Sequence, residues 1–199
     1  MASAIHANAI GEINTAIDKA LDHIGHLDHV KRFHGALIRG ADENNHGKGK
    51  IGDHGWGLHT PPAGYPDKPT VTSEVGYSES EKKLESDVSF WLNPDQGCAN
   101  VTLTLRIDKK KPALTLNNWQ KADNRVTRNS THHRGIEEKQ SIMMTRGDNG
   151  QVVLSGHPLV IPFELFFRRQ PIGNQERDLE ITKERLTIMA QNIWLSQGF

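Results

Sequence analysis

Histidine and glycine are concentrated in one segment, Phe33–Lys68, which reads FHGALIRGADENNHGKGKIGDHGWGLHTPPAGYPDK. Seven of the eleven histidines lie between His23 and His59. Histidine titrates near neutral pH and is the commonest metal ligand, and glycine lets a backbone approach a ligand closely. The segment therefore predicts a loop that carries a catalytic or metal-binding site. The alternative is an irregular surface loop whose histidines are solvated.

Three residues of this segment, Asp53, His54 and His59, are the predicted catalytic residues. His54 and His59 would act as metal ligands or as an acid/base pair, and Asp53 would orient an imidazole or serve as a further ligand. The predicted metal ligands are His34, His46, His54 and His59. Imidazole and carboxylate ligands favour zinc, which would lower the pKa of a bound water. A divalent metal, zinc first, is the predicted cofactor.

A second polar stretch, residues 117–140, carries Arg125, Arg128, His133 and Arg134. Guanidinium and imidazole groups can cradle a phosphate or a developing oxyanion, so these four residues are the predicted substrate-binding set. A solvated polar loop would have the same composition.

A third pattern consists of Asp95, Asp108 and Lys110, in which two carboxylates are followed by a lysine. Carboxylates that hold Mg²⁺ beside a lysine are typical of metal-dependent nucleases. The run after Asp108 also has the composition of a hairpin tip.

The composition of the chain argues against several classes of function. The 199 residues include 24 Lys and Arg and 24 Asp and Glu, so no strong electrostatic footprint for nucleic acid or an acidic membrane is present. The single cysteine, Cys98, excludes an internal disulfide framework and a zinc ribbon built from cysteines. No secretory signal and no apolar run of membrane-spanning length is found, so a soluble cytoplasmic protein is expected.

Hydrophobic periodicity predicts a single domain over residues 1–199. It begins with a helix over 4–38, which overlaps the histidine/glycine loop 33–68. A strand-rich region follows over 88–167, with Val88–Leu92 as a short strand and Val101–Ile107 as the clearest one. Residues 70–83 are interpreted as a connection, and a second amphipathic helix is predicted over 174–195. The predicted fold is α+β, a mostly antiparallel sheet of about six strands covered by the two terminal helices.

Two functions remain open, and residue types alone do not decide whether the chain is an enzyme. The first is a soluble histidine-dependent hydrolase, such as a metal-dependent phosphodiesterase or nuclease-like effector. The second is a non-enzymatic binding or assembly module of a virus, phage or secretion system. In that case the histidine/glycine loop and an edge strand within residues 159–167 would contact a protein partner or a second copy.

Overall fold

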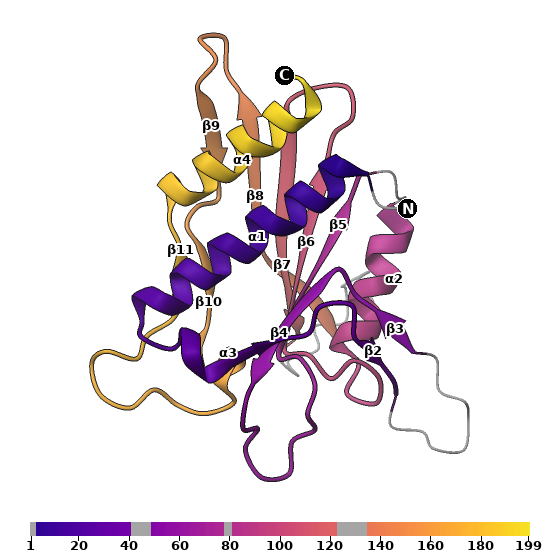
Figure 1. Ribbon diagram of the computed structural model, residues 1–199, viewed down its shortest axis with the longest axis vertical. Coiled ribbons are helices and arrows are strands. Elements are labelled where there is room, and N and C mark those ends of the chain that lie inside the picture. The colour runs from indigo at the N-terminus through magenta and orange to yellow at the C-terminus, as the bar shows by residue number, and fades with distance from the viewer. Residues whose placement is uncertain (1–2, 41–48, 78–80, 123–134) are drawn as a thin grey trace, which may run out of the picture.

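A seven-stranded, mostly antiparallel sheet forms the centre of the computed structural model, which describes residues 3–40, 49–77, 81–122 and 135–199 (Figure 1). Its strands, in spatial order, are β1 (Val30–Arg32), β4 (His54–Leu58), β5 (Val71–Gly76), β6 (Val101–Ile107), β7 (Ala113–Lys121), β8 (Ile136–Arg146) and β9 (Val152–Ser155). Within the described residues, β5 and β6 are the one parallel pair of this sheet. The expected α+β class and mostly antiparallel sheet are confirmed, with a sheet larger than the six strands predicted.

Smaller elements surround this sheet. Two further strand pairs are β2 (Leu37–Ile38) with β3 (Lys50–Ile51), and β10 (Leu159–Ile161) with β11 (Leu179–Ile181). The helices are α1 (Ala4–His23), the 3₁₀ helix η1 (Leu27–His29), α2 (Glu81–Leu92), α3 (Phe163–Phe167) and α4 (Lys183–Gln197). No helix in the described part of the chain combines the length and the apolar character needed to cross a membrane.

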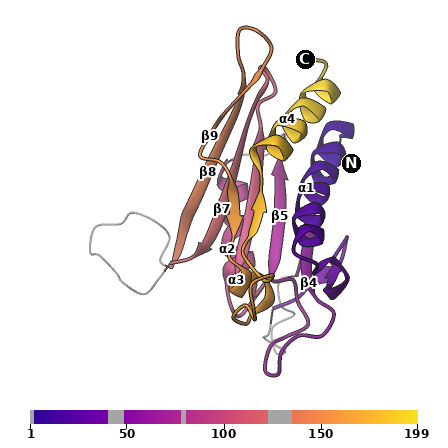
Figure 2. The ribbon, with the colours of Figure 1, turned by 90° about the vertical axis from the view of Figure 1, so that its left-hand side faces the viewer.

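Helices cover the two faces of the sheet unequally. Helices α1 and α4 lie side by side across one face, whereas α2 lies against β5, β6 and β7 on the opposite face (Figures 1 and 2). Since β5 and β6 are parallel, the chain must cross over between them, and α2 is that crossover. Within the described residues, no helix covers the rest of the sheet face beside α2, and there the outward side chains of β8 are exposed.

The first helix is shorter than the sequence predicts. The Ser3 hydroxyl accepts the His6 amide at 3.2 Å and caps α1, and Ile13, Ile17 and Leu21 form its buried stripe. The predicted helix over 4–38 is wrong beyond residue 23, because α1 ends there, Gly25 adopts a φ of 71° and the chain turns away.

Three further predictions, two of element type and one of a helix boundary, are wrong. The apolar run at 88–92 is the end of helix α2, whose residues Leu84, Val88 and Trp91 face the sheet at helical spacing. Residues 70–83 are no mere connection, because they contain β5, in which every residue is buried. The last helix begins after Thr182, whose hydroxyl accepts the Arg185 amide, rather than near residue 174.

The apolar run over 159–167 is not the exposed edge strand that the assembly hypothesis needs. It folds into β10 and α3, and Leu159, Ile161 and Phe163 are fully buried. One edge of β10 pairs with β11, and on its other side Val160 donates to Gln140 and accepts from Asn118. No backbone group of Val160 is therefore left to pair with another chain.

Candidate active site

Asp53 lies directly before β4 and reaches across to the neighbouring strand. Its Oδ2 atom accepts the backbone N–H of Val75 on β5 at 2.7 Å and lies 3.2 Å from His6 Nε2 on α1. His6 Nε2 is also 3.0 Å from the carbonyl oxygen of Val75. Because a carbonyl only accepts, Nε2 carries the proton and donates toward both oxygens. One carboxylate oxygen and one carbonyl oxygen thus face a single position, which His6 fills.

Glu74, on β5, is more deeply buried than the neighbouring carboxylates Asp53 and Asp87. It is 4% exposed, its Oε1 accepts the indole N–H of Trp91 at 2.5 Å, and the same oxygen lies 3.2 Å from Lys50 Nζ. Burial raises the pKa of Glu74 to about 7, although Lys50 and the Trp91 hydrogen bond act in the opposite direction. Asp53 and Asp87 add smaller upward contributions to that pKa. Glu74 therefore changes charge near neutral pH.

Lys50, on β3, links this carboxylate to helix α2. Its ammonium lies 2.8 Å from Asp87 Oδ1, and Lys83 lies 3.0 Å from the other oxygen of Asp87. Lys50 and Asp87 are each mostly buried, so their ion pair is shielded from solvent. The group Asp53, Glu74, Lys50, Asp87 and His6, here called the carboxylate–lysine cluster, joins residues from three strands or their ends and two helices.

Gly52 permits this cluster to pack. A methyl group at that position would lie 2.6 Å from the Trp91 ring and 3.3 Å from Glu74 Oε1. Since Trp91 is buried, its ring cannot swing away, and we expect Gly52→Ala to lower the free energy of unfolding by about 1–3 kcal/mol. Urea denaturation measures this change in the free energy of unfolding. The matched control is Gly11→Ala in α1, where nothing lies within 4 Å, which should raise stability by up to about 1 kcal/mol. Equal changes in both variants would contradict the packing role.

The predicted catalytic histidines do not lie together. His54 is 4% exposed, and its Nδ1 is 3.2 Å from Asn14 on α1, while its Nε2 is buried with no hydrogen-bond partner among the described residues. Burial, followed by the nearby His34, lowers the pKa of His54 to about 4. The His34 and His54 rings are 5.7 Å apart. His59 is exposed beyond the other end of β4, five residues or roughly 16 Å along the strand from His54.

The described part of the fold does not bring the remaining predicted site residues together. His46 and the predicted substrate-binding residues lie outside the described residues; the latter are Arg125, Arg128, His133 and Arg134. Asp108 accepts the amide of Lys110 at 2.8 Å, as expected of the tip of the β6–β7 hairpin. In the described ranges, no three His, Cys, Asp or Glu side chains form a group that could hold a metal. Zinc binding therefore stays a prediction.

Asp53 is the one member of the carboxylate–lysine cluster that the sequence predicted as a site residue. His6, Lys50, Glu74 and Asp87 were missed, because strand pairing and helix packing bring them together across eighty residues of sequence. One signal was present. Glu74 is the single charged residue of the run Val71–Gly76, which has strand composition. A carboxylate inside a buried strand is costly unless it is paired or functional.

Comparisons with known proteins identify no family. No protein-family model matches the chain, and no curated protein is similar to it in sequence. Among solved structures, the chain is similar to a protein of Anabaena variabilis ATCC 29413 described as a "putative nuclease belonging to DUF820". The TM-score is 0.48 and the identity 9%, over 96% of this chain and 84% of that one. At this identity no functional residue can be transferred from that protein.

Proposed function

We propose that the chain is a divalent-cation-dependent hydrolase of phosphodiesters whose active site is the carboxylate–lysine cluster. The observation that carries the proposal is the buried Glu74 carboxylate beside the Lys50 ammonium, with Asp53, at the end of the adjoining strand, close enough to contribute to the raised pKa of Glu74. Oxygen donors and an ammonium in a mostly buried site suit phosphoryl chemistry, in which catalysis is chiefly positioning and charge stabilisation. The proposed site replaces the histidine pair with carboxylates and a lysine.

The proposed cation would be held by Asp53, Glu74 and the Val75 carbonyl, with water completing its shell. These are hard oxygen donors, which suit Mg²⁺ or Mn²⁺ better than zinc. Such a cation lowers the pKa of a bound water and stabilises charge on the phosphoryl oxygens. The raised pKa of Glu74 supports this proposal, because a buried carboxylate whose ionisation is disfavoured gains from a cation beside it.

Lys50 and His6 would support the reaction from opposite sides. Lys50 already lies 3.2 Å from Glu74 and 2.8 Å from Asp87, so its ammonium is held in place to neutralise a phosphate oxygen. His6 donates to Asp53 and to the Val75 carbonyl, so it occupies the position that the cation would take. His6 would therefore turn aside or become a further ligand when the cation binds.

The test is hydrolysis of bis(p-nitrophenyl) phosphate and of fluorescent DNA and RNA oligonucleotides with Mg²⁺, Mn²⁺ or EDTA. We expect cation-dependent cleavage that falls at least about 100-fold in Asp53→Asn and Lys50→Met. The matched control is His59→Gln, an exposed residue at the far end of β4, which should keep full activity.

Cation binding by calorimetry separates two kinds of failure. Binding of Mg²⁺ or Mn²⁺ that is lost in Asp53→Asn, without cleavage of these substrates, would retain the cation site and redirect the search for substrate. Absence of binding at 10-fold above cellular concentrations, or undiminished cleavage by Asp53→Asn, would refute the proposed site. Loss of activity in His59→Gln would instead favour the histidine mechanism.

A further inference from the structure

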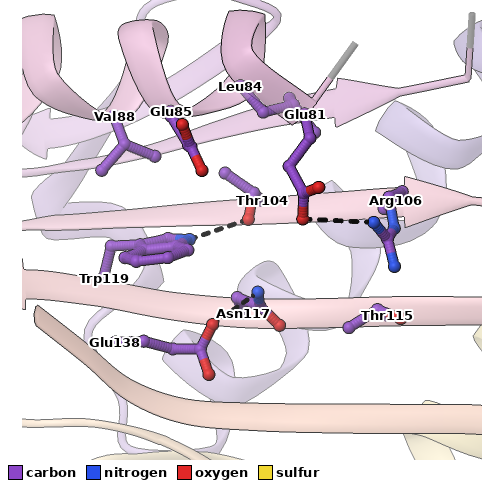
Figure 3. A pocket seen from close by; sticks show the side chains of 10 residues that line it. All are labelled: Glu81, Leu84, Glu85, Val88, Thr104, Arg106, Thr115, Asn117, Trp119 and Glu138. Atoms are coloured by element: carbon purple, nitrogen blue, oxygen red, sulfur yellow. Dashed lines mark hydrogen bonds and ion pairs between the residues drawn. The ribbon is translucent and has the colours of Figure 1, made fainter. Parts of the chain in front are cut away.

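A groove lies between helix α2 and the sheet face beside it, where Glu85 and Val88 of α2 lie across from Trp119 and Glu138. Two adjoining cavities, of about 470 and 120 Å³, form it and share four lining residues, Glu85, Val88, Trp119 and Glu138. Figure 3 shows the smaller cavity, with α2 above it and the strands β6 to β8 below. This groove is separate from the carboxylate–lysine cluster and shares no residue with it.

Trp119 provides the aromatic surface of the groove. Its ring is half-buried on β7, and its indole N–H donates to the Thr104 hydroxyl at 2.9 Å, which fixes the ring plane. The other three tryptophans of the chain are buried, with Trp56 at 0%, Trp91 at 2% and Trp194 at 3% exposure. Trp119 is thus the one tryptophan whose ring a ligand in solution can reach.

The charges around Trp119 are mostly negative. In Figure 3 the ring lies between Glu85 of α2 and Glu138 of β8. Both carboxylates are exposed, and neither has an ion-pair partner in the part of the chain that the structure describes. Glu138 accepts the Asn117 amide at 2.8 Å, which orients it.

The other charged groups of the groove are already paired. Glu81 pairs with Arg106 at 3.4 Å, and Glu137 pairs with Lys139. Among the groove residues that the structure describes, Glu85 and Glu138 are therefore the two carboxylates without a counter-ion, and they make this lining negative.

We infer that this groove binds a cationic side chain, a lysine or arginine, from a basic peptide segment of a partner protein. A cation above an indole ring is attracted by the ring quadrupole, most strongly for tryptophan. Glu85 and Glu138 would supply two charge-assisted hydrogen bonds from opposite sides. The same carboxylates repel phosphate, so the groove is not a path for the nucleic acid or other phosphodiester proposed as substrate. The inference is independent of the proposed function.

The accessible tryptophan gives a direct assay. Acrylamide quenching of intrinsic fluorescence is measured on the full chain at 50 mM salt, with a tetra-arginine peptide blocked at both ends as the probe. Subtracting the signal of Trp119→Phe isolates Trp119. We expect saturable protection of Trp119 with a Kd below 1 mM. The affinity should fall at least 10-fold in the Glu85→Gln/Glu138→Gln double variant, whose exposed positions leave the core intact.

Controls make each outcome decisive. A tetra-glutamate peptide should give no protection, and Glu180→Gln, an exposed change on β11, should leave the affinity unchanged. Three results would overturn the inference: no protection at 5 mM peptide, equal protection of the double variant, or protection by a DNA oligonucleotide. Thermal denaturation of the double variant, matching the wild type, shows that a lost response is not a folding defect.

Discussion

Replacing Glu74 with glutamine is expected to make the protein more stable at pH 8 while removing the proposed activity. Burial raises the pKa of Glu74 to about 7, compared with an ordinary value of 4.5, so ionising this residue costs more in the folded chain than in the unfolded chain. Glutamine has nearly the same shape, keeps an oxygen for the Trp91 indole, and carries no charge to bury. The variant keeps the packing, loses the ionisation cost, and lacks a carboxylate for the cation.

The pH window follows from the direction of this shift. Between about pH 4.5 and 7 the folded chain holds a proton on Glu74 that the unfolded chain has lost. Stability that is present at low pH is therefore lost as the pH rises through the folded pKa. The shift corresponds to a penalty on the order of 3 kcal/mol at pH 8, which Glu74→Gln should remove.

Urea denaturation at pH 5 and pH 8 tests this expectation. The difference in the free energy of unfolding between the wild type and Glu74→Gln should change by about 2 kcal/mol or more between the two pH values. The free energy of unfolding of Glu180→Gln, a change at an exposed position, should follow that of the wild type. Mg²⁺ at millimolar concentration should stabilise the wild type more at pH 8 than at pH 5, and should not stabilise Glu74→Gln. A variant that is less stable than the wild type at pH 8 would mean that the Lys50 ion pair outweighs the burial of Glu74.

Secondary structure was predictable where apolar and polar residue types alternate along the sequence or recur at helical spacing. The strand Val101–Ile107 was predicted with its observed bounds, because its inward residues alternate with polar ones. Strands β4 and β5 are buried throughout and contain glycine, histidine and threonine instead of a continuous aliphatic run. Neither helical nor strand periodicity marks such segments, so β4 was assigned to a loop and β5 to a connection.

The site was less predictable than the fold, for a related reason. Counting histidines found the segment in which Asp53 and Lys50 occur, but the sequence alone does not show which side chains of that segment meet. The pairing of β4 with β5, with His54 opposite Ser73, determines the sheet face to which each of these side chains points. It directs His54 toward α1, where it contacts Asn14, while Glu74 on β5 contacts Trp91 of α2 on the other face.

His54, predicted to be catalytic, is expected instead to act as a buried neutral group that makes the fold sensitive to acid. Its pKa is lowered to about 4, chiefly by burial, from an ordinary value of 6.5. The unfolded chain therefore takes up a proton on this residue at higher pH than the folded chain does. Stability is fully present above pH 6.5 and is lost as the pH falls toward 4, by an amount on the order of 3 kcal/mol.

His54→Gln should reduce this acid sensitivity and keep the proposed activity at pH 7. Because Glu74 contributes with the opposite sign over an overlapping window, the comparison is best made in the Glu74→Gln background, by urea denaturation at pH 7 and pH 4. There the loss of stability should be about 3 kcal/mol smaller with His54→Gln than without it, while His59→Gln changes nothing. NMR titration of the imidazoles provides a direct measurement of the His54 pKa. If His54 titrates near 6.5, or if His54→Gln abolishes hydrolysis while remaining folded, His54 is accessible to protons or substrate and the histidine mechanism gains support.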